Sequence, residues 1–232
     1  MASVLGVIPV RLASKRFPEK ALASLDGKPL VQHVYTRALQ AKSLDRLIVA
    51  TDHPRIAEVV RGFGGEVQLT TGSHPTGSDR VWEVAKGTGF HRIVNIQGDQ
   101  PLVDPACIDA CVAALSDDGV DMATAAAPLE NLKASQDVVR VVTDPQNFAV
   151  AFSRHSQPER GVNWRHIGIY AFQRSTLESF SSRPQAAEEI RKGLEQIRVL
   201  AYGGKVKVVF VASAAPAVDR REDLQSVMDW KS

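Results

Sequence analysis

The strongest constraint on the fold is an alternation of short apolar runs with amphipathic helical patterns. Strand-like runs at residues 4–8, 46–51 and 92–96 are each followed by a helical pattern, at 29–42, 54–63 and 105–115. Such βαβ units predict a parallel sheet with helices on both faces. Because ligands of these sheets bind beyond the carboxyl ends of the strands, we expect segments 10–20 and 97–101 to line one cleft.

From about residue 122 the pattern changes to runs that pair more readily as antiparallel hairpins, with a turn at 143–147. We therefore expect an antiparallel subregion over roughly 122–172 within a single domain of residues 1–232. A chain of 232 residues can close one sizeable core and would be cramped as two domains. The predicted fold class is α/β, with a mostly parallel central sheet, helices on both faces and a small antiparallel insertion.

Charge and hydropathy narrow the classes of partner. The formal net charge is only +2, so we expect no broad basic surface and no nucleic-acid partner. No apolar stretch reaches the roughly 18 residues of a membrane span, and the N-terminal run lacks the basic lead of a signal peptide. A cytoplasmic protein with no membrane partner is expected. Cys107 and Cys111 are interpreted as small buried side chains rather than as metal ligands.

The loop after the first strand carries a cluster of cations. Residues 9–20 read PVRLASKRFPEK, with four basic residues, Arg11, Lys15, Arg16 and Lys20. Most such clusters are solvated surface loops, but this one follows the carboxyl end of a strand, where ligands bind. A transferring phosphoryl group needs cations on its oxygens and on the departing pyrophosphate. The candidates for binding a nucleoside triphosphate are Arg11, with its planar guanidinium, and Lys20, with its compact ammonium group.

Two familiar phosphate-binding motifs do not fit this sequence. No GxGxxG follows the first strand, so the dinucleotide fingerprint is missing. The run Gly27-Lys28-Pro29 lacks the upstream glycine and the Ser or Thr of a P-loop. The basic loop, with Pro18 directing its course, must hold phosphates without those glycines.

Two acidic segments stand out further along the chain. Residues 93–101 read IVNIQGDQP, a buried strand followed by a glycine turn and Asp99. Mg²⁺ takes one or two carboxylates plus substrate oxygens, so Asp99 suits it, although the run also reads as an ordinary Gly-Asp turn. Asp219, in AVDRREDL at 217–224, reads on its own as a cap of the last helix.

These segments resemble motifs of the sugar cytidylyltransferases, especially the 3-deoxy-manno-octulosonate cytidylyltransferases. Residues 9–20 are similar to P-x-R-x-x-S-x-R-[FL]-P-x-K, residues 95–101 to N-x-Q-G-D-[EQ]-P, and residues 217–224 to G-V-D-T-P-E-D-L. Further segments match at 76–80, 152–154, 165–170 and 194–200, so the resemblance covers nearly the whole chain. It implies a nucleotide-diphospho-sugar transferase-like fold and a homodimer.

The resemblance implies a nucleotide side and a metal site. The nucleotide-binding residues would be Pro9, Arg11, Ser14 and Lys20, with Ser78 and Arg80 from TGSDR at 76–80. Ser14 would lie near the cytosine of CTP. Outside this context, an arginine that opens an amphipathic helix is more often a surface residue. Asp99 and Asp219 would together hold Mg²⁺.

The resemblance also implies a pocket for an acidic sugar. Arg154 in FSR at 152–154, and His166 and Tyr170 in RHIGIY at 165–170, would line it, and Gln97 would approach the sugar. An arginine or an imidazolium is a sensible partner for a sugar carboxylate. Glu195 and Gln196, in LEQIRVL at 194–200, would bond sugar hydroxyls. On spacing alone these two belong to a plain helix face.

Three departures from the family pattern bear on these expectations. Glu19 stands where a glycine is usual and is expected to bring negative charge beside the phosphates. The connection between Arg154 and His166 is shorter than usual, which affects the sugar side and the subunit contact. Asp219 lacks the T-P that normally follows it.

The predicted reaction is attack of the anomeric hydroxyl of an acidic 3-deoxy sugar on the α-phosphorus of CTP, with Mg²⁺ as cofactor. Arg11, Lys20 and Asp99 are expected to carry the catalysis. The sugar would be 3-deoxy-manno-octulosonate, its 8-amino form or a nonulosonate. Two rivals stay open. One is a glycosyltransferase or other nucleotidyltransferase, although Asp219 and Asp223 are spaced wrongly for a D-x-D motif. The other is a CTP-binding module without turnover.

Overall fold

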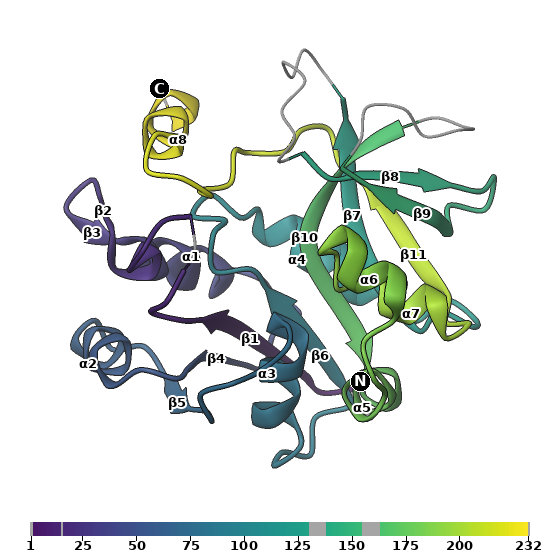
Figure 1. The fold of residues 1–232 in the computed structure, drawn as a ribbon, viewed down its shortest axis with the longest axis horizontal. Coiled ribbons are helices and arrows are strands. Elements are labelled where there is room, and N and C mark those ends of the chain that lie inside the picture. The colour runs from purple at the N-terminus through teal and green to yellow at the C-terminus, as the bar shows by residue number, and fades with distance from the viewer. Residues whose placement is uncertain (1, 15, 130–137, 155–162, 232) are drawn as a thin grey trace.

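The computed structural model describes residues 2–14, 16–129, 138–154 and 163–231. A nine-stranded sheet runs through them (Figure 1), and its main path has the order β11-β7-β10-β6-β1-β4-β5. Its strands are β1 (Val4–Val10), β4 (Arg46–Thr51), β5 (Val67–Leu69), β6 (Arg92–Ile96), β7 (Met122–Pro128), β8 (Arg140–Thr143), β9 (Ala149–Ser153), β10 (Asn163–Gln173) and β11 (Val206–Phe210). A separate ribbon pairs β2 (Ser24–Leu25) with β3 (Lys28–Pro29).

The N-terminal part of the sheet is parallel. β1 pairs in parallel with both β4 and β6, and β4 pairs in parallel with β5. Between these strands the chain returns through α1 (Leu30–Ala38), α2 (Pro54–Gly62) and α3 (Gly77–Ala85), as parallel pairing requires. The carboxyl ends of β1 and β6 therefore lie side by side at one edge of the sheet.

β10 brings antiparallel pairing into the same sheet. It pairs with β6, β7 and β8, and β8 pairs with β9 across the turn predicted at 143–147. β7 and β10 lie inside the main sheet, where β11 joins β7 in parallel. The register between β10 and β7 shifts between Ile167 and Tyr170, a bulge that contains Gly168. The predicted α/β class, with antiparallel pairings after residue 122, is confirmed.

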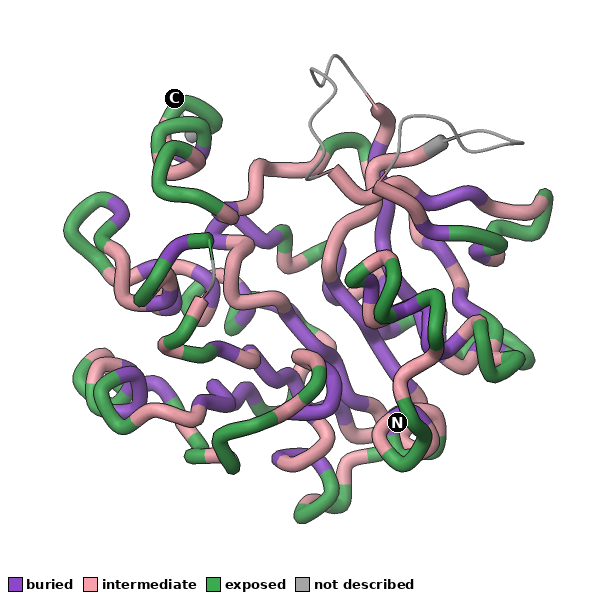
Figure 2. The backbone as a smooth tube through the Cα atoms, in the orientation of Figure 1, coloured by how far each residue is buried: buried purple, intermediate pink, exposed green. Residues whose placement is uncertain are grey.

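Both faces of the sheet are covered, because the side chains of β1 alternate between two cores. Val4 and Ile8 pack on the side of α1, α2 and α4 (Pro105–Ala114). Leu5 and Val7 pack on the side of α3, α5 (Arg174–Ser182) and α7 (Ile197–Ala201). Figure 2 shows buried strands between partly exposed helices. Burial on both faces explains why β1 reads as a continuous apolar run.

Several helices differ in extent from the prediction. The helix predicted over 29–42 ends at Ala38. Glu195 and Gln196, interpreted on spacing as part of one helix face, lie instead between two short helices, α6 (Ala187–Lys192) and α7, and Gly193, with φ 63°, terminates α6. Glycine ends the helix there because no Cβ opposes a positive φ. β5 and α5 have no counterpart in the prediction. None of the helices described is long and apolar enough to traverse a membrane.

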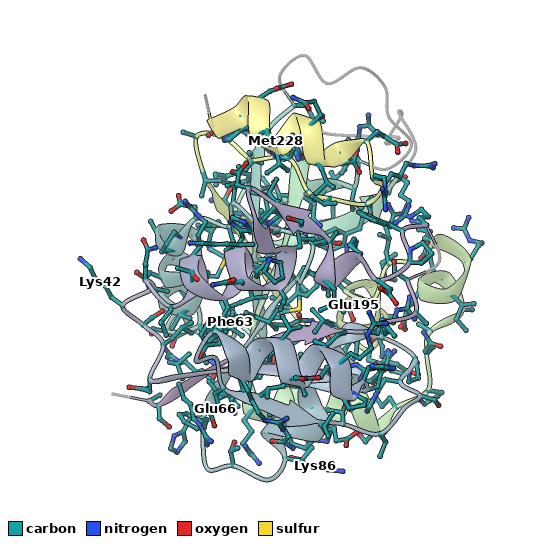
Figure 3. All side chains as sticks on the ribbon, turned by 90° about the vertical axis from the view of Figure 1, so that its left-hand side faces the viewer. Lys42, Phe63, Glu66, Lys86, Glu195 and Met228 are labelled. Atoms are coloured by element: carbon teal, nitrogen blue, oxygen red, sulfur yellow. The ribbon has the colours of Figure 1, made fainter. Side chains whose placement is uncertain are left out.

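A third, smaller core fastens the last helix, α8 (Asp223–Lys231), to the loop after β1. It contains Phe17, Leu25, Leu102, Val218 and Val227. Figure 3 shows Met228 of α8 toward one end of the molecule and Glu195 nearer its middle. This core holds the segment before α8 against the carboxyl ends of β1 and β6, and that segment contains Asp219.

Candidate functional site

Two cavities meet beyond the carboxyl ends of β1 and β6. The first, here called the loop cavity, has a volume of about 720 Å³ and is lined by the loop after β1 and by residues 72–77. The second, here called the strand cavity, has a volume of about 990 Å³ and is lined by β10, α6 and residues 213–217. They share a wall made of Arg16, Pro75, Thr76, Gly77, Gln97, Asp99 and Asp219. Ligands in the two cavities would therefore meet at this shared wall.

Gly98 allows the end of β6 to approach the end of β1. A Cβ at this position would overlap the side chain of Val10 and lie 3.2 Å from the Pro9 carbonyl oxygen, so glycine is required. Asp99 follows directly, and its carbonyl accepts a hydrogen bond from Val218 N (2.8 Å). That bond joins the two acidic segments, which are far apart in the sequence.

Lys20 lies between Asp99 and Asp219. Its Nζ is 3.3 Å from Asp99 Oδ2 and 3.6 Å from Asp219 Oδ1. The same Nζ donates a hydrogen bond to the Val218 carbonyl (2.8 Å). Arg16 brings a second cation, with Nη2 2.8 Å from Asp219 Oδ1. Two carboxylates that are distant in the sequence thus converge on the ammonium group of Lys20, which is the first residue of the short 3-10 helix η1 (Lys20–Leu22).

The donor set at this point suits a hard divalent cation. The side chains of Asp99 and Asp219 belong to the shared wall and stay partly exposed, at 27% and 24%. Mg²⁺ takes one or two carboxylates and completes its coordination with water and substrate oxygens. The position of Lys20 shows that the pair favours positive charge. These two carboxylates therefore fit the predicted magnesium site.

The loop cavity collects the cations of the loop after β1. Arg11, Arg16 and Lys20 line it, together with Pro9 and Ser14. Lys15, the remaining cation of the sequence cluster, lies outside the described residues. One end of the cavity is therefore rich in positive charge, which attracts a polyphosphate.

Glu19 binds α2 instead of lining the cavity. Its carboxylate accepts from Arg55, with Oε1 2.6 Å from Nη1 and Oε2 3.2 Å from Nη2. These hydrogen bonds from Arg55 lower the pKa of Glu19. The residue has φ 56°, a left-handed backbone that glycine adopts without strain, which accounts for the glycine usual in the family. The expectation that Glu19 brings negative charge beside the phosphates is wrong, because Arg55 pairs that charge away from the cavity wall.

Ser78 and Arg80 lie in the first turns of α3, beside the loop cavity. Arg80 lines the cavity, and its guanidinium donates to Asp52 Oδ2 (2.8 Å) and Thr70 Oγ1 (2.6 Å). Ser78 is fully buried, and its Oγ accepts from Asn95 Nδ2 (3.0 Å). The structure places Arg80 on the wall and the Ser78 hydroxyl behind it.

Gln97 and Glu195 form a hydrogen-bonded pair at the shared wall. Gln97 Nε2 donates to Glu195 Oε1 (2.9 Å), and Ser78 N donates to Glu195 Oε2 (2.9 Å). Burial raises the pKa of Glu195, and the hydrogen bond from Ser78 N partly opposes that rise. Arg154, just after β9, lines the strand cavity with this pair.

His166 and Tyr170 form a buried stack on β10. Their rings lie 5.6 Å apart at an interplanar angle of 16°, and both residues line the strand cavity. Burial, followed by the nearby charge of Arg154, lowers the pKa of His166 to about 3. The imidazole is therefore neutral near pH 7, so His166 cannot be the imidazolium partner considered for a sugar carboxylate.

Thr124 and Gln196 hold the two rings in place. The Thr124 hydroxyl donates to the Ile169 carbonyl (2.8 Å) and lies 2.9 Å from His166 Nε2, so the neutral ring donates through Nε2. Tyr170 OH donates to Gln196 Oε1 (3.2 Å), and burial raises the pKa of Tyr170. Gln196 Nε2 is buried with no hydrogen-bond partner among the described residues. Gln196 lines the strand cavity, and an unpaired buried donor of this kind gains from a hydrogen-bond partner.

A buried ionic cluster behind the strand cavity was not anticipated from the sequence. Arg198 donates to both oxygens of Glu189 (2.8 and 2.6 Å) and to Asp79 Oδ1 (3.0 Å). Its guanidinium also lies 3.9 Å from the centroid of the Phe180 ring. The cluster ties α3, α5, α6 and α7 together. Arg198 belongs to the 194–200 motif, but helical spacing gives no sign of these partners.

Arg165 is a second residue that the sequence reasoning missed. Its Nη1 and Nη2 donate to the carbonyls of Ala214 (2.8 Å) and Ala215 (3.0 Å). These bonds hold the segment that leads to Asp219, and Arg165 also lines the strand cavity. Its place in the RHIGIY run was the available signal.

The chain matches known proteins over nearly its whole length. The family described as Cytidylyltransferase matches residues 5–208. The 3-deoxy-manno-octulosonate cytidylyltransferase of Geobacter sulfurreducens is 41% identical over 246 residues, which cover 98% of each chain. The protein of the same name from Syntrophotalea carbinolica is 44% identical over 242 residues, which cover 97% of each.

Solved structures share the fold. The structure of CMP:2-keto-3-deoxy-manno-octonic acid synthetase complexed with CTP matches with a TM-score of 0.90 and 32% identity, over 99% of this chain and 98% of that one. The 4-diphosphocytidyl-2C-methyl-D-erythritolsynthase of Anaerococcus prevotii matches with a TM-score of 0.67 and 14% identity, over 100% of this chain and 99% of that one. The second likeness concerns the fold alone.

Proposed function

This chain belongs to the cytidylyltransferase family, and from that premise we propose that it transfers CMP from CTP to 3-deoxy-manno-octulosonate and releases pyrophosphate. Relatives about 40% identical over nearly the whole chain carry this activity in their names, and a neighbouring synthetase was solved with CTP. The observation that carries the proposal is the meeting of Asp99, Asp219 and Lys20 at the wall shared by two cavities.

We assign CTP to the loop cavity and the sugar acid to the strand cavity. Arg11, Arg16 and Lys20 supply the positive charge that a triphosphate needs. In the strand cavity, Arg154 supplies a cation for the sugar carboxylate, and the buried amide of Gln196 supplies a donor for a sugar oxygen. With this assignment the anomeric hydroxyl and the α-phosphate meet at the shared wall.

The residues of the chain then act by position and charge. The anomeric oxygen forms a bond to the α-phosphorus while the bond to pyrophosphate breaks, and the hydroxyl proton leaves to solvent. Arg11 and Lys20 offset the charge on the phosphates and on the departing pyrophosphate. Asp99 and Asp219 would hold Mg²⁺, which would supply positive charge at the phosphate oxygens and favour ionisation of the hydroxyl.

The resemblance to the family extends the proposal to the enzyme's setting. We place the reaction in the cytoplasm, in a homodimer that requires Mg²⁺ and supplies an activated sugar for lipopolysaccharide synthesis. The 8-amino derivative and the nonulosonates remain alternative substrates, because Arg154 would pair with the carboxylate of each. A CTP-binding module without turnover would be favoured by unpaired negative charge beside the phosphates, but Arg55 pairs the Glu19 carboxylate.

The test is pyrophosphate release from CTP with each of these sugar acids, with and without Mg²⁺. We expect turnover with 3-deoxy-manno-octulosonate that depends on Mg²⁺. If no pyrophosphate is released with any of the sugar acids, the remaining interpretation is a CTP-binding module without turnover. A protein that consumes a finished nucleotide sugar instead would be a glycosyltransferase.

Asp99→Asn tests the metal site within the same assay. We expect turnover to fall by about 100-fold or more, because an ion at this point is worth several kcal/mol to a charged transition state. Asp118→Asn, at an exposed position away from both cavities, is the matched control and should behave as wild type. An Asp99→Asn protein with near-normal turnover would remove the role we give this residue.

A further inference from the structure

The carboxylate of Glu195 is surrounded by donors of the protein itself. Oε2 accepts from Ser78 N (2.9 Å), at the start of α3. Oε1 accepts from Gln97 Nε2 (2.9 Å) and also lies 3.4 Å from Asn95 Nδ2. Both oxygens are therefore engaged by donors of the protein, from α3 and from the end of β6, which leaves Glu195 a poor candidate for the direct sugar contact that the family resemblance implies.

Among the residues that the structure describes, Gln97 has a hydrogen-bond partner at only one end of its amide. Its Nε2 donates to Glu195, so its Oε1 is the end that remains to accept, and Gln97 lines both cavities. The chain packs closely around it, since a Cβ at Gly168 would lie 2.9 Å from Gln97 Cγ and 3.0 Å from Gln100 Nε2. The side chain therefore has little room to change position, although its amide can still turn over.

We propose that Glu195 is a positioning residue. By accepting a hydrogen bond from Gln97 Nε2, Glu195 keeps the Gln97 oxygen facing the cavities at the shared wall, and that oxygen accepts a hydrogen bond from a hydroxyl of the sugar. The inference rests on the proposed function, since it concerns the acceptor of the same reaction. It moves Glu195 from the set of sugar contacts to the set of residues that act through another side chain.

Glu195→Gln separates the two roles. Ser78 N is a backbone donor and cannot turn, so the new amide must offer it the oxygen and must offer Gln97 the NH₂ group. Gln97 then turns over and presents its own NH₂ to the sugar in place of an acceptor. We expect kcat/KM for the sugar to fall by about 10- to 100-fold, as for the loss of a hydrogen bond in a buried site. The Kd for CTP should stay unchanged.

A double-mutant cycle with Gln97→Met gives the decisive comparison. Methionine preserves the length of the side chain and removes both ends of the amide. If Glu195 acts through Gln97, adding Glu195→Gln to Gln97→Met lowers kcat/KM for the sugar no further. A direct sugar contact would instead make the two losses multiply, and that result would overturn the proposal, as would an equal loss of CTP affinity in Glu195→Gln.

A second variant keeps the test open if Glu195→Gln melts below the assay temperature. In the exchanged pair Gln97→Glu with Glu195→Gln, the new Gln amide donates to the new carboxylate, which keeps an acceptor at the shared wall. This protein must turn the sugar over faster than Gln97→Met, and an equal or lower rate would overturn the role of Glu195. A wild type that releases no pyrophosphate with any sugar acid would instead overturn the proposed function, and with it this role.

Discussion

Replacing Arg198 with methionine should cost the fold several kcal/mol. The side chain of Arg198 is 2% exposed, and its partners Asp79 and Glu189 are 8% and 2% exposed. Methionine keeps much of the volume but leaves two buried carboxylates without their cation. Breaking a buried ion pair by removing one partner costs about 3–5 kcal/mol. For a chain of this size each kcal/mol moves Tm by about 2–4 °C, so we expect a fall of roughly 6–20 °C.

Urea unfolding and thermal melts, followed by circular dichroism, measure this cost. Arg183→Met is the matched control, because Arg183 is exposed and stacks its guanidinium 4.7 Å from the Tyr202 ring centroid. It should cost about 1 kcal/mol or less. Adding Asp79→Asn and Glu189→Gln to Arg198→Met should recover part of the loss, because the uncompensated charge is then gone. A loss equal to that of Arg183→Met, or no recovery in the triple variant, would refute the reasoning.

Three further predictions follow from single contacts. Gly168→Ala places a Cβ 2.9 Å from Gln97 Cγ, so KM for the sugar should rise and the free energy of unfolding should fall by about 1–3 kcal/mol. KM for CTP should not change, and unchanged sugar kinetics would contradict this prediction. Glu19→Gln should leave KM for CTP within about twofold of wild type, because the carboxylate is paired with exposed Arg55 outside the cavity, whereas Arg11→Met, on the cavity wall, should raise it. His166→Asn should weaken the loss of stability in acid. Below pH 6.5, the ordinary pKa of histidine, His166 binds a proton in the unfolded chain but not in the folded one, where its pKa is about 3. The wild type therefore loses about 1.4 kcal/mol of stability per pH unit as the pH falls below 6.5. Urea midpoints at pH 7, 6 and 5 that decline in parallel for the two proteins would contradict a buried, neutral His166.

The parts of the fold that depend on local patterns could be predicted from the sequence. β1, β4 and β6 are apolar runs followed by helical patterns, and parallel pairing places the carboxyl ends of these strands at the same edge of the sheet. The proximity of Asp99 and Asp219 could not be worked out that way, because it depends on the small core that fastens α8 and on the bond from Val218 N to the Asp99 carbonyl. Only the resemblance to family motifs pointed to it.

Charge states and orientations were the least accessible to sequence reasoning. His166 is neutral because burial outweighs any benefit of protonation, and Glu19 pairs with Arg55 because a left-handed backbone directs its side chain there. Neither the burial of a strand residue nor the sign of φ at one loop position can be read from residue type. Both follow from tertiary packing.

Glu195 shows where motif reasoning reaches its limit. A motif preserves the residue type at a position, and a carboxylate beside a sugar pocket is naturally interpreted as a contact to hydroxyls. Whether its oxygens face the ligand or the protein depends on which donors the fold brings within about 3 Å. Here those donors come from positions 117, 98 and 100 residues away in the sequence. The direction of the bond from Gln97 then decides which end of an amide meets the substrate, so the site's chemistry depends on an arrangement that its residue types allow but do not specify.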